Sequence, residues 1–483
     1  MRSSIFLFAL LIVTVTAHTR ASDRGSVHIK NATVITITGD DLENTDVIIE
    51  NGIITAVGQN LATPRNAEVV DAEGMYLMPG IIDAHSHLAI TRGVNEATHP
   101  VTAEVSMYDV INPNDVGMYR ALAGGVTAIH TMHGSANVIG GQGATLKLHY
   151  GRDADELRFE GAPRTIKFAL GENPTRVHGQ GFNVQPRTRM GVEQIVREHF
   201  DAAIEYREKR TRYEQEKARH ESNPRRNPAP EPVARNIRLD VLADIIGGDI
   251  LVHCHSYRAD EILMLMRVFN DYGIKNYTFQ HANEAFKVAP ELKANGAHTS
   301  IFADWWAYKF EVYYSTPYNA AILNKYGVVN SINSDSPEVI RHLNHEAAKT
   351  VKYGGVSHNE ALRMITLNPA IQLGIDHLTG SVEVGKQGDL SLWSAHPLSI
   401  YAINEMTFVD GVKRFDRQAD ADDQRLQVNV SETYDAASES EAGRHHDACM
   451  QDVWYFFGEQ SNVSQQHLNF QFNEMQQLNG HLH

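Results

Sequence analysis

The sequence predicts an α/β protein, a (β/α)8 barrel of the TIM type with a small β-sandwich domain built from both ends of the chain. Between 80 and 373, apolar runs typical of buried strands alternate with helical patterns. Short β-rich segments flank this region at 27–79 and at 374–415. An open doubly wound sheet is the alternative, but it normally carries a phosphate-binding turn with GxGxxG spacing, and Gly140–Gly143 lacks that spacing. We therefore expect a barrel at 80–373 and one composite β-sandwich from the two flanking segments.

Length, charge and cysteine content limit the possible classes of protein. The 483 residues suffice for one large domain with a satellite, and 42% apolar with 21% charged residues is ordinary for a globular protein. A net charge of −16 argues against a basic surface, so we expect no nucleic-acid partner. The two cysteines, Cys254 and Cys449, are too few for a disulfide framework or a cysteine-built zinc site.

The first 21 residues have the pattern of a secretory signal peptide. Arg2 supplies a positive start, Ile5–Val15 is apolar, and Ala17 and Ala21 are plausible cleavage points. The apolar run is shorter than the roughly 20 residues that span a membrane. We therefore expect a secreted or periplasmic protein that has no membrane association after the signal is removed.

The flanking segments read as short strands joined by turns. The first segment contains two β-rich runs around Asn51-Gly52, a dipeptide that favours a hairpin turn. A similar pattern returns at 380–386 and 389–393. Strand sets on both sides of a long α/β region indicate one domain that both ends complete.

The middle region contains seven apolar runs that we expect to be barrel strands. They are Gly80–Ala84, Val126–Thr131, Thr165–Leu170, Asp249–His253, Tyr277–His281, Ala297–Ile301 and Val328–Ser334. Residues 137–142 are expected to form a loop over the barrel mouth, where glycines let the backbone approach a substrate.

Two further segments stand outside this pattern. Within 192–232, the stretch Val192–His220 has apolar residues at helical spacing and then becomes charged all round. It predicts a long surface helix, with a lid or a contact between copies of the chain as the alternative. Residues 416–483 form a polar C-terminal extension.

Two histidines, His85 and His87, follow the first barrel strand one residue apart. Residues i and i+2 of a strand point to the same face, so both imidazoles leave the sheet on one side. Paired neutral imidazoles suit a divalent metal such as zinc. The plain alternative is that one histidine packs and the other is solvated.

Comparable residues recur at the ends of later strands. The run Leu251–His255 ends in a second HxH pair, in which His253 directly follows the apolar run and is preferred over His255 as a ligand. His281 ends another strand, and Asp335 follows the last one. Active sites of this fold lie at that end of the barrel, so we expect one shared metal centre.

A lysine, Lys167, stands inside an apolar strand, where an unpaired ammonium is costly. Carbamylation by CO2 would turn it into an anionic oxygen ligand able to bridge two metals. Two alternatives remain: Lys167 pairs with Glu172, or Glu172 is itself the metal ligand.

As an ordered set, these motifs resemble the amidohydrolase superfamily of metal-dependent hydrolases, in particular its imidazolonepropionase-like and prolidase-like branch. The matching stretches run from about Val27 to Trp393. They are MPGIIDAHSH, the GGVT turn, HCHSYRADEI, the strand ending at His281, NSDSPE, MITLNPA and GSVEVGKQGDLSLW.

The resemblance implies a barrel with a composite β-sandwich and one or two divalent metals, zinc first. The metal ligands that it implies are His85, His87, Lys167, His253, His281 and Asp335. Of these, His85, His87 and Asp335 would hold the more buried metal, and carbamylated Lys167 would bridge to a second metal on the remaining histidines.

The expected activity is hydrolysis of a carbon–nitrogen bond by metal-activated hydroxide, in a small amide, a cyclic amide or a dipeptide. Asp335 would accept the proton and pass it to the leaving amine. Loop residues expected to contact substrate are His133, Arg176, His178, His255 and Tyr257. The alternatives are a deaminase of a base-like ring and a non-catalytic metal-binding homologue. A homo-oligomer is compatible with the sequence.

Overall fold

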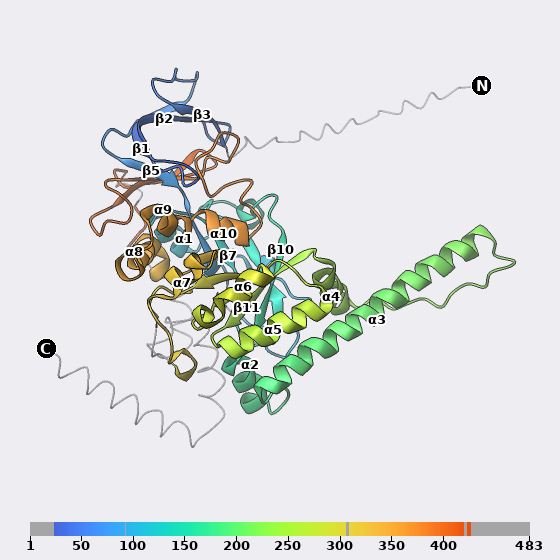
Figure 1. The fold of residues 1–483 in the computed structure, drawn as a ribbon. Helices are drawn as coiled ribbons and strands as arrows, with labels where there is room; N and C mark the ends of the chain where they lie inside the picture. Colours follow the sequence, from blue (N-terminus) through green and yellow to red (C-terminus); the bar gives the residue numbers. More distant parts are fainter. Residues whose placement is uncertain (1–23, 92, 306–308, 420–422, 427–483) are drawn as a thin grey trace, which may run out of the picture.

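The computed structural model describes residues 24–91, 93–305, 309–419 and 423–426 (Figure 1). The expected signal peptide at 1–21 lies outside the described residues, as does most of the extension at 416–483. In the described part of the chain, no helix is both long enough and apolar enough to cross a membrane.

One sheet contains strands from both ends of the described chain. The N-terminal strands are β1 (Val27–Val34), β2 (Leu42–Glu50), β3 (Ile53–Gly58), β4 (Glu68–Asp71) and β5 (Tyr76–Pro79). The C-terminal strands are β15 (Leu390–Trp393), β16 (Asn404–Val409) and β17 (Val412–Asp416). The two sets join where β15 pairs antiparallel with β5. The Asn51-Gly52 turn joins β2 to β3, and both residues have the positive φ that a tight hairpin turn needs.

The middle of the chain forms two further sheets. A three-stranded sheet contains β6 (Ile81–Ser86), β7 (Val126–Thr131) and β9 (Ala144–Lys147). A six-stranded sheet contains β8 (Ile139–Gln142), β10 (Arg164–Ala169), β11 (Ile250–Ser256), β12 (Tyr277–His281), β13 (His298–Ile301) and β14 (Asn330–Ile332). From β10 to β14, neighbouring strands are parallel.

The architecture is therefore mixed α/β, and strand pairing among the described residues does not close into the predicted ring. The ladder on β14 stops at Ile332, and two hydrogen bonds beyond it reach β6. The Asp335 N–H donates to the His85 carbonyl at 3.1 Å, and the Ser334 N–H donates to Asp83 Oδ1 at 3.2 Å. These contacts hold the ends of β14 and β6 together.

The loop expected at 137–142 is wrong, because residues 139–142 form the buried strand β8. A Cβ at Gly140 would lie 2.7 Å from His133 Nδ1, and one at Gly141 would lie 2.6 Å from Val105 Cγ2. These glycines thus permit close packing within the sheet and do not mark a loop over the barrel mouth.

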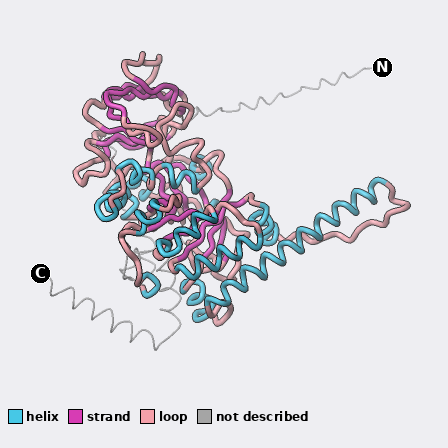
Figure 2. The backbone as a smooth tube through the Cα atoms, in the orientation of Figure 1, coloured by secondary structure: helices cyan, strands magenta, loops and turns pink. Residues whose placement is uncertain are grey.

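Helices surround the strands of the middle region (Figures 1 and 2). They are α1 (Val116–Ala123), α2 (Glu172–Pro174), α3 (Arg189–Ser222), α4 (Ile237–Gly247), α5 (Ala259–Tyr272), α6 (Ala289–Asn295), α7 (Asn319–Lys325), α8 (Leu343–Gly354), α9 (His358–Arg363) and α10 (Leu367–Gln372).

The long helix predicted at 192–220 is confirmed as the 34-residue α3. The Thr188 side chain accepts a hydrogen bond from the Gly191 N–H and caps its start. Its buried residues all lie between Val192 and Tyr206, and the remainder extends away from the body (Figure 1).

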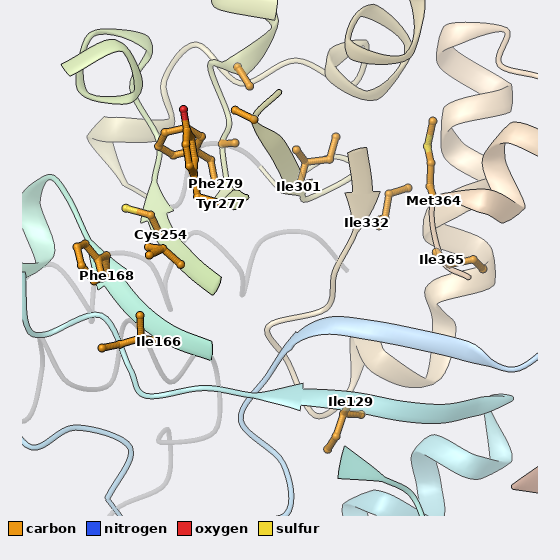
Figure 3. Packing of buried hydrophobic residues seen from close by; sticks show 14 of the residues in the cluster. Ile129, Ile166, Phe168, Cys254, Tyr277, Phe279, Ile301, Ile332, Met364 and Ile365 are labelled. Atoms are coloured by element: carbon orange, nitrogen blue, oxygen red, sulfur yellow. The ribbon is translucent and has the colours of Figure 1, made fainter. Parts of the chain in front are cut away.

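Alternate residues of the middle strands pack against the helices (Figure 3). Phe168 of β10 is one of them, and its ring centroid lies 6.2 Å from that of Phe200 on α3 and 6.1 Å from that of Phe269 on α5. Because strand side chains alternate, Lys167 points to the opposite face of the sheet. The apolar contacts thereby fix which residues face away from the helices.

A glycine just before β6 allows that strand to approach β7. A Cβ at Gly80 would lie 2.1 Å from Thr127 Oγ1 and 2.2 Å from Thr127 Cγ2. We expect Gly80→Ala to lower the free energy of unfolding by about 2 kcal/mol, since overpacking forces backbone shifts. Denaturant unfolding measures this. Gly58→Ala, whose Cβ would have its nearest neighbour at 3.6 Å, is the control, and equal losses in both variants would contradict the explanation.

Candidate metal centre

Three buried side chains from separate strand ends meet in the middle region. The nitrogen and oxygen atoms that His85, His281 and Asp335 could offer to a metal all lie within 4.8 Å of one another. His87 reaches the same carboxylate, with its Nε2 atom 3.3 Å from Asp335 Oδ1. The corresponding distance from His85 Nε2 is 3.5 Å. The structure therefore brings these four predicted residues together.

Local backbone geometry explains how His281 reaches the centre. Phe279 packs in the apolar core, so strict alternation would turn Gln280 inward and His281 outward. His281 instead has φ of 66°, a left-handed conformation that is uncommon for residues other than glycine. Asp335, with φ of 44°, shares this feature. Such strained backbone is concentrated at functional sites.

Hydrogen bonding orients His87 toward the carboxylate. Its Nδ1 atom lies 2.9 Å from the Met132 carbonyl oxygen, which can only accept, so Nδ1 carries the proton and donates. The lone pair then lies on Nε2, the atom that faces Asp335. This is the arrangement by which proteins orient a metal-binding histidine.

The charge state of the centre also suits a metal. Burial lowers the pKa of His85 well below its usual value and that of His281 to about 3, so both imidazoles are neutral at pH 7. Burial alone would raise the pKa of Asp335, but the neighbouring imidazoles of His87 and His281 bring it below the usual value. Neutral imidazoles around one carboxylate are a donor set that zinc prefers.

The same atoms have hydrogen-bonding capacity that the described residues do not use. His87 Nε2, Asp335 Oδ1 and both ring nitrogens of His281 are buried and make no hydrogen bond within the described part of the chain. Buried polar atoms are almost always bonded, so an unsatisfied group of this kind needs a partner. A divalent cation fits it.

Lys167 reaches this centre and Glu172 does not. The Lys167 Nζ atom lies 3.2 Å from His85 Nε2. The Glu172 carboxylate turns to Arg176, whose Nη2 atom is 3.3 Å away, and to Lys309, whose Nζ atom is 3.9 Å away. Of the two residues, Lys167 is therefore the one that lies beside His85 in the candidate centre.

The two histidines of β11 lie at different depths. His253 is paired in register with Lys167, and its ring centroid lies 4.4 Å from that of His130. The ring of His255 lies 4.8 Å from that of His281. The sequence preferred His253 as the ligand, whereas the structure places His255 beside His281.

The other residues expected to contact substrate differ in their placement. Tyr257 is buried, with its ring stacked 5.4 Å from His281. His133 uses both nitrogens on the backbone: Nδ1 donates to the Gly134 carbonyl, and Nε2 accepts from the Glu96 N–H. Arg176 is 41% exposed and pairs with Glu172, and His178 is buried, with its pKa lowered to about 4 by burial. Of these four side chains, Tyr257 is the one in contact with a residue of the centre.

Two residues of this region were missed from the sequence. Asp83 accepts hydrogen bonds from the Ser334 hydroxyl and the His85 N–H, and burial raises its pKa to about 7. Its spacing of two from His85 was the available signal. Gln280 lies between His85 and His253, with side-chain contacts to both. No sequence pattern indicated Gln280. If His281 faces the centre, regular strand alternation places Gln280 on the opposite face of the sheet.

A separate hollow of about 700 Å3 lies between α3 and α4. Its lining includes Tyr206, Arg210, Asp240 and Asp249 and contains none of the candidate ligands. It is therefore not part of the metal centre.

Comparison with known proteins gives a consistent match. The model of the amidohydrolase family matches residues 76–415. An amidohydrolase structure from Thermotoga maritima MSB8 is 33% identical with a TM-score of 0.74, covering 81% of this chain and 100% of that one. The amidohydrolase tasK of Hapsidospora irregularis is 29% identical over 397 residues, 77% of this chain and 40% of that protein. A dihydropyrimidinase of Dictyostelium discoideum is 36% identical over 110 residues, 23% of this chain and 19% of that protein. The chain thus spans less than half the length of these two curated relatives.

Proposed function

The chain belongs to the amidohydrolase family, hydrolases that act on carbon–nitrogen bonds, and on this premise we propose that it cleaves an amide bond of a small molecule. The observation that carries the proposal is the buried group of His85, His281 and Asp335, with atoms that could bind a metal within 4.8 Å of one another. Relatives named amidohydrolase and dihydropyrimidinase support a linear or cyclic amide as substrate.

We further propose an organisation in which the two middle sheets act as one barrel and the segments 27–79 and 374–415 form its satellite domain. The contact between Asp335 and the His85 carbonyl, and the pairing of β5 with β15, support this organisation. Export is proposed from the signal-like segment 1–21, which lies outside the described residues.

The residues that would hold a divalent cation, zinc first, are His85, His87, His281 and Asp335, with Lys167 adjacent. When bound, the cation would polarise the scissile carbonyl and lower the pKa of water toward neutrality.

The chain's own groups would position the substrate and move the proton. The buried Asp335 carboxylate would take the proton from the attacking water and deliver it to the leaving nitrogen, which must be protonated to depart as an amine. Tyr257, stacked on His281, would flank the substrate carbonyl. Burial of the centre would exclude bulk water and strengthen these interactions.

The test is a substrate screen of the full chain loaded with Zn2+, using dipeptides, N-acyl amino acids and cyclic amides. We expect turnover of at least one class, lost on chelation and restored by Zn2+, with a carboxylate and an amine as products. Chelation serves as the internal control for a contaminating metal-independent enzyme.

Two results would contradict the proposal. Release of ammonia from base-like rings without cleavage of any amide would indicate a deaminase. Retention of metal with no turnover of any compound would indicate a non-catalytic protein.

A further inference from the structure

One lysine, Lys309, is buried in a loop that follows a strand of the six-stranded sheet. The loop lies between β13 and α7, and the lysine side chain is 6% exposed. Its Nζ atom lies 4.4 Å from the centroid of the Tyr257 ring. A lysine is rarely buried unless its charge is compensated, so the surroundings of this ammonium need an explanation.

The ring of Tyr257 connects Lys309 to the metal centre. Its centroid lies 4.6 Å from that of His255 and 5.4 Å from that of His281. Burial is the main reason that the pKa values of these two histidines are low, and the positive charge of Lys309 lowers them further. A fixed positive charge therefore lies one aromatic ring away from residues of the centre.

The ion pair between Lys309 and Glu172 is a long one. Lys309 Nζ is 3.1 Å from Asn173 Oδ1 and 3.9 Å from Glu172 Oε1, and the second distance exceeds that of a charge-assisted hydrogen bond. Glu172 lies nearer to Arg176, at 3.3 Å. A positive charge beside a cation site also opposes metal binding, because like charges repel. An anionic group placed between Lys309 and the metal would be attracted by both.

Other cations near this loop are directed elsewhere. Arg176 is 41% exposed and pairs with Glu172, and Arg189 pairs with two buried carboxylates. Lys309 differs from both because its ammonium lies against the ring that contacts the candidate ligands. It is therefore the group best placed to bind an anion beside the centre.

We propose that the substrate carries a free carboxylate next to the scissile amide and that the Lys309 ammonium binds this carboxylate. N-acyl amino acids and dipeptides both have such a group, within one residue, or about 3.6 Å, of the scissile bond. Lys309 would thus select these compounds over neutral amides. The inference rests on the proposed function and narrows its substrate class.

The experiment compares compounds that differ only in this group. N-acetyl amino acids and dipeptides are assayed beside their C-terminal amides, with the zinc-loaded full chain, and products are identified so that only cleavage of the shared bond is counted. We expect the wild type to prefer the acids by roughly 10- to 100-fold in kcat/KM, the scale of a hydrogen bond between charged groups. Lys309→Met should remove this preference, mainly by raising KM for the acids.

A binding measurement removes the dependence on turnover. Calorimetry on zinc-loaded Asp335→Asn, with and without Lys309→Met, follows binding of the same acids and amides. We expect the acids to bind more tightly only where Lys309 is present. Zinc affinity should be unchanged or higher after Lys309→Met, because a like charge is removed. A lysine with a purely structural role would instead weaken the binding of acids, amides and zinc together.

A second lysine over an aromatic ring provides the matched control. Lys287 Nζ lies 4.1 Å from the centroid of the Tyr314 ring and 2.9 Å from Glu284 Oε1, outside the stack on His281. Lys287→Met should therefore keep the preference for acids. Lys309→Gln, which is neutral and can still donate to Asn173, replaces Lys309→Met if that variant does not fold.

The outcomes separate this inference from the proposed activity. No preference for acids in the wild type, or a preference that survives loss of the Lys309 charge, would overturn the inference. A screen without turnover, together with binding of acids that requires Lys309, would refute the activity and leave carboxylate recognition standing. Amides cleaved as fast as acids would do the reverse.

Discussion

Asp335→Asn is expected to reduce turnover by about a thousandfold while the protein keeps most of its metal, because general acid–base groups contribute on this scale. Asparagine preserves the shape of the side chain, and an oxygen can still face His87, where the carboxylate Oδ1 lies 3.3 Å from Nε2. An amide cannot accept the proton of the attacking water at neutral pH. The measurement pairs kcat on the substrate found by screening with metal content per chain.

The control for this variant removes a nearby acid outside the centre. Glu338→Gln changes an exposed side chain three residues along the same segment and should leave kcat and metal content near wild-type values. Near-normal turnover in Asp335→Asn would remove Asp335 from the mechanism. Metal loss with turnover recovered at high zinc would limit its role to binding.

Strands whose side chains are buried on both faces were readily predicted from the sequence. The expected runs Val126–Thr131 and Tyr277–His281 coincide with β7 and β12, because continuous apolar runs that include β-branched or aromatic residues are typical of buried strands. Since polar residues at the ends of such strands face one edge of the sheet, the sequence alone places His85, His87 and Asp335 close together.

The inward turn of both Gln280 and His281 could not be predicted in the same way. A strand of regular alternation presents one of two consecutive residues to a given face, and only the left-handed backbone at His281 brings both inward. Nothing in the sequence requires that conformation of a histidine. The sequence also could not show which of His253 and His255 lies nearer to His281. Both side chains point to the same face of β11, and their positions along the strand are set by the register with β10.

The division of the middle strands between two sheets, in place of the predicted closed ring, was also not indicated by the sequence. The strands β8 and β9 are four residues each and are separated by Gly143, so neither gives a run long enough to recognise. A Cβ at Gly143 would lie 2.6 Å from His130 Nε2 and from Thr165 Oγ1. This glycine marks a place where the chain passes from one sheet to the other in tight contact with both.

Lys147→Met is expected to lower the free energy of unfolding by about 3 kcal/mol, since removing one partner of a buried ion pair leaves the other charge uncompensated. The Lys147 ammonium at the end of β9 lies 3.1 Å from Asp389 Oδ2 and 2.5 Å from Asp410 Oδ1. Asp389 directly precedes β15 and Asp410 lies in the turn between β16 and β17, so this buried cluster joins the eight-stranded sheet to the middle region. Chemical denaturation of the variant and the wild type at pH 7 measures the loss.

A second lysine with two carboxylate partners serves as the control, because it differs from Lys147 in how far its side chain is buried. Lys413 on β17 also contacts two carboxylates, with its Nζ atom 2.9 Å from Glu68 Oε1 and 2.7 Å from Asp416 Oδ2, but its side chain is 26% exposed. Because exposed ion pairs contribute little, Lys413→Met should cost roughly 0.5 kcal/mol. Equal losses from the two substitutions would show that burial of Lys147 does not determine its contribution.

The pH dependence of the Lys147 effect follows from Asp410. Burial alone would raise the pKa of this carboxyl, but the hydrogen bond from His149 and the charge of Lys147 lower it to about 2. A carboxyl whose pKa is lower in the folded than in the unfolded chain adds stability above the unfolded value of about 3.9 and loses it as the pH falls. Lys147→Met removes part of this lowering, so the stability difference between wild type and variant should be full at pH 7 and shrink between about pH 4 and pH 2. A difference that stays constant across that range would mean that the contribution of Lys147 does not depend on the charge of Asp410.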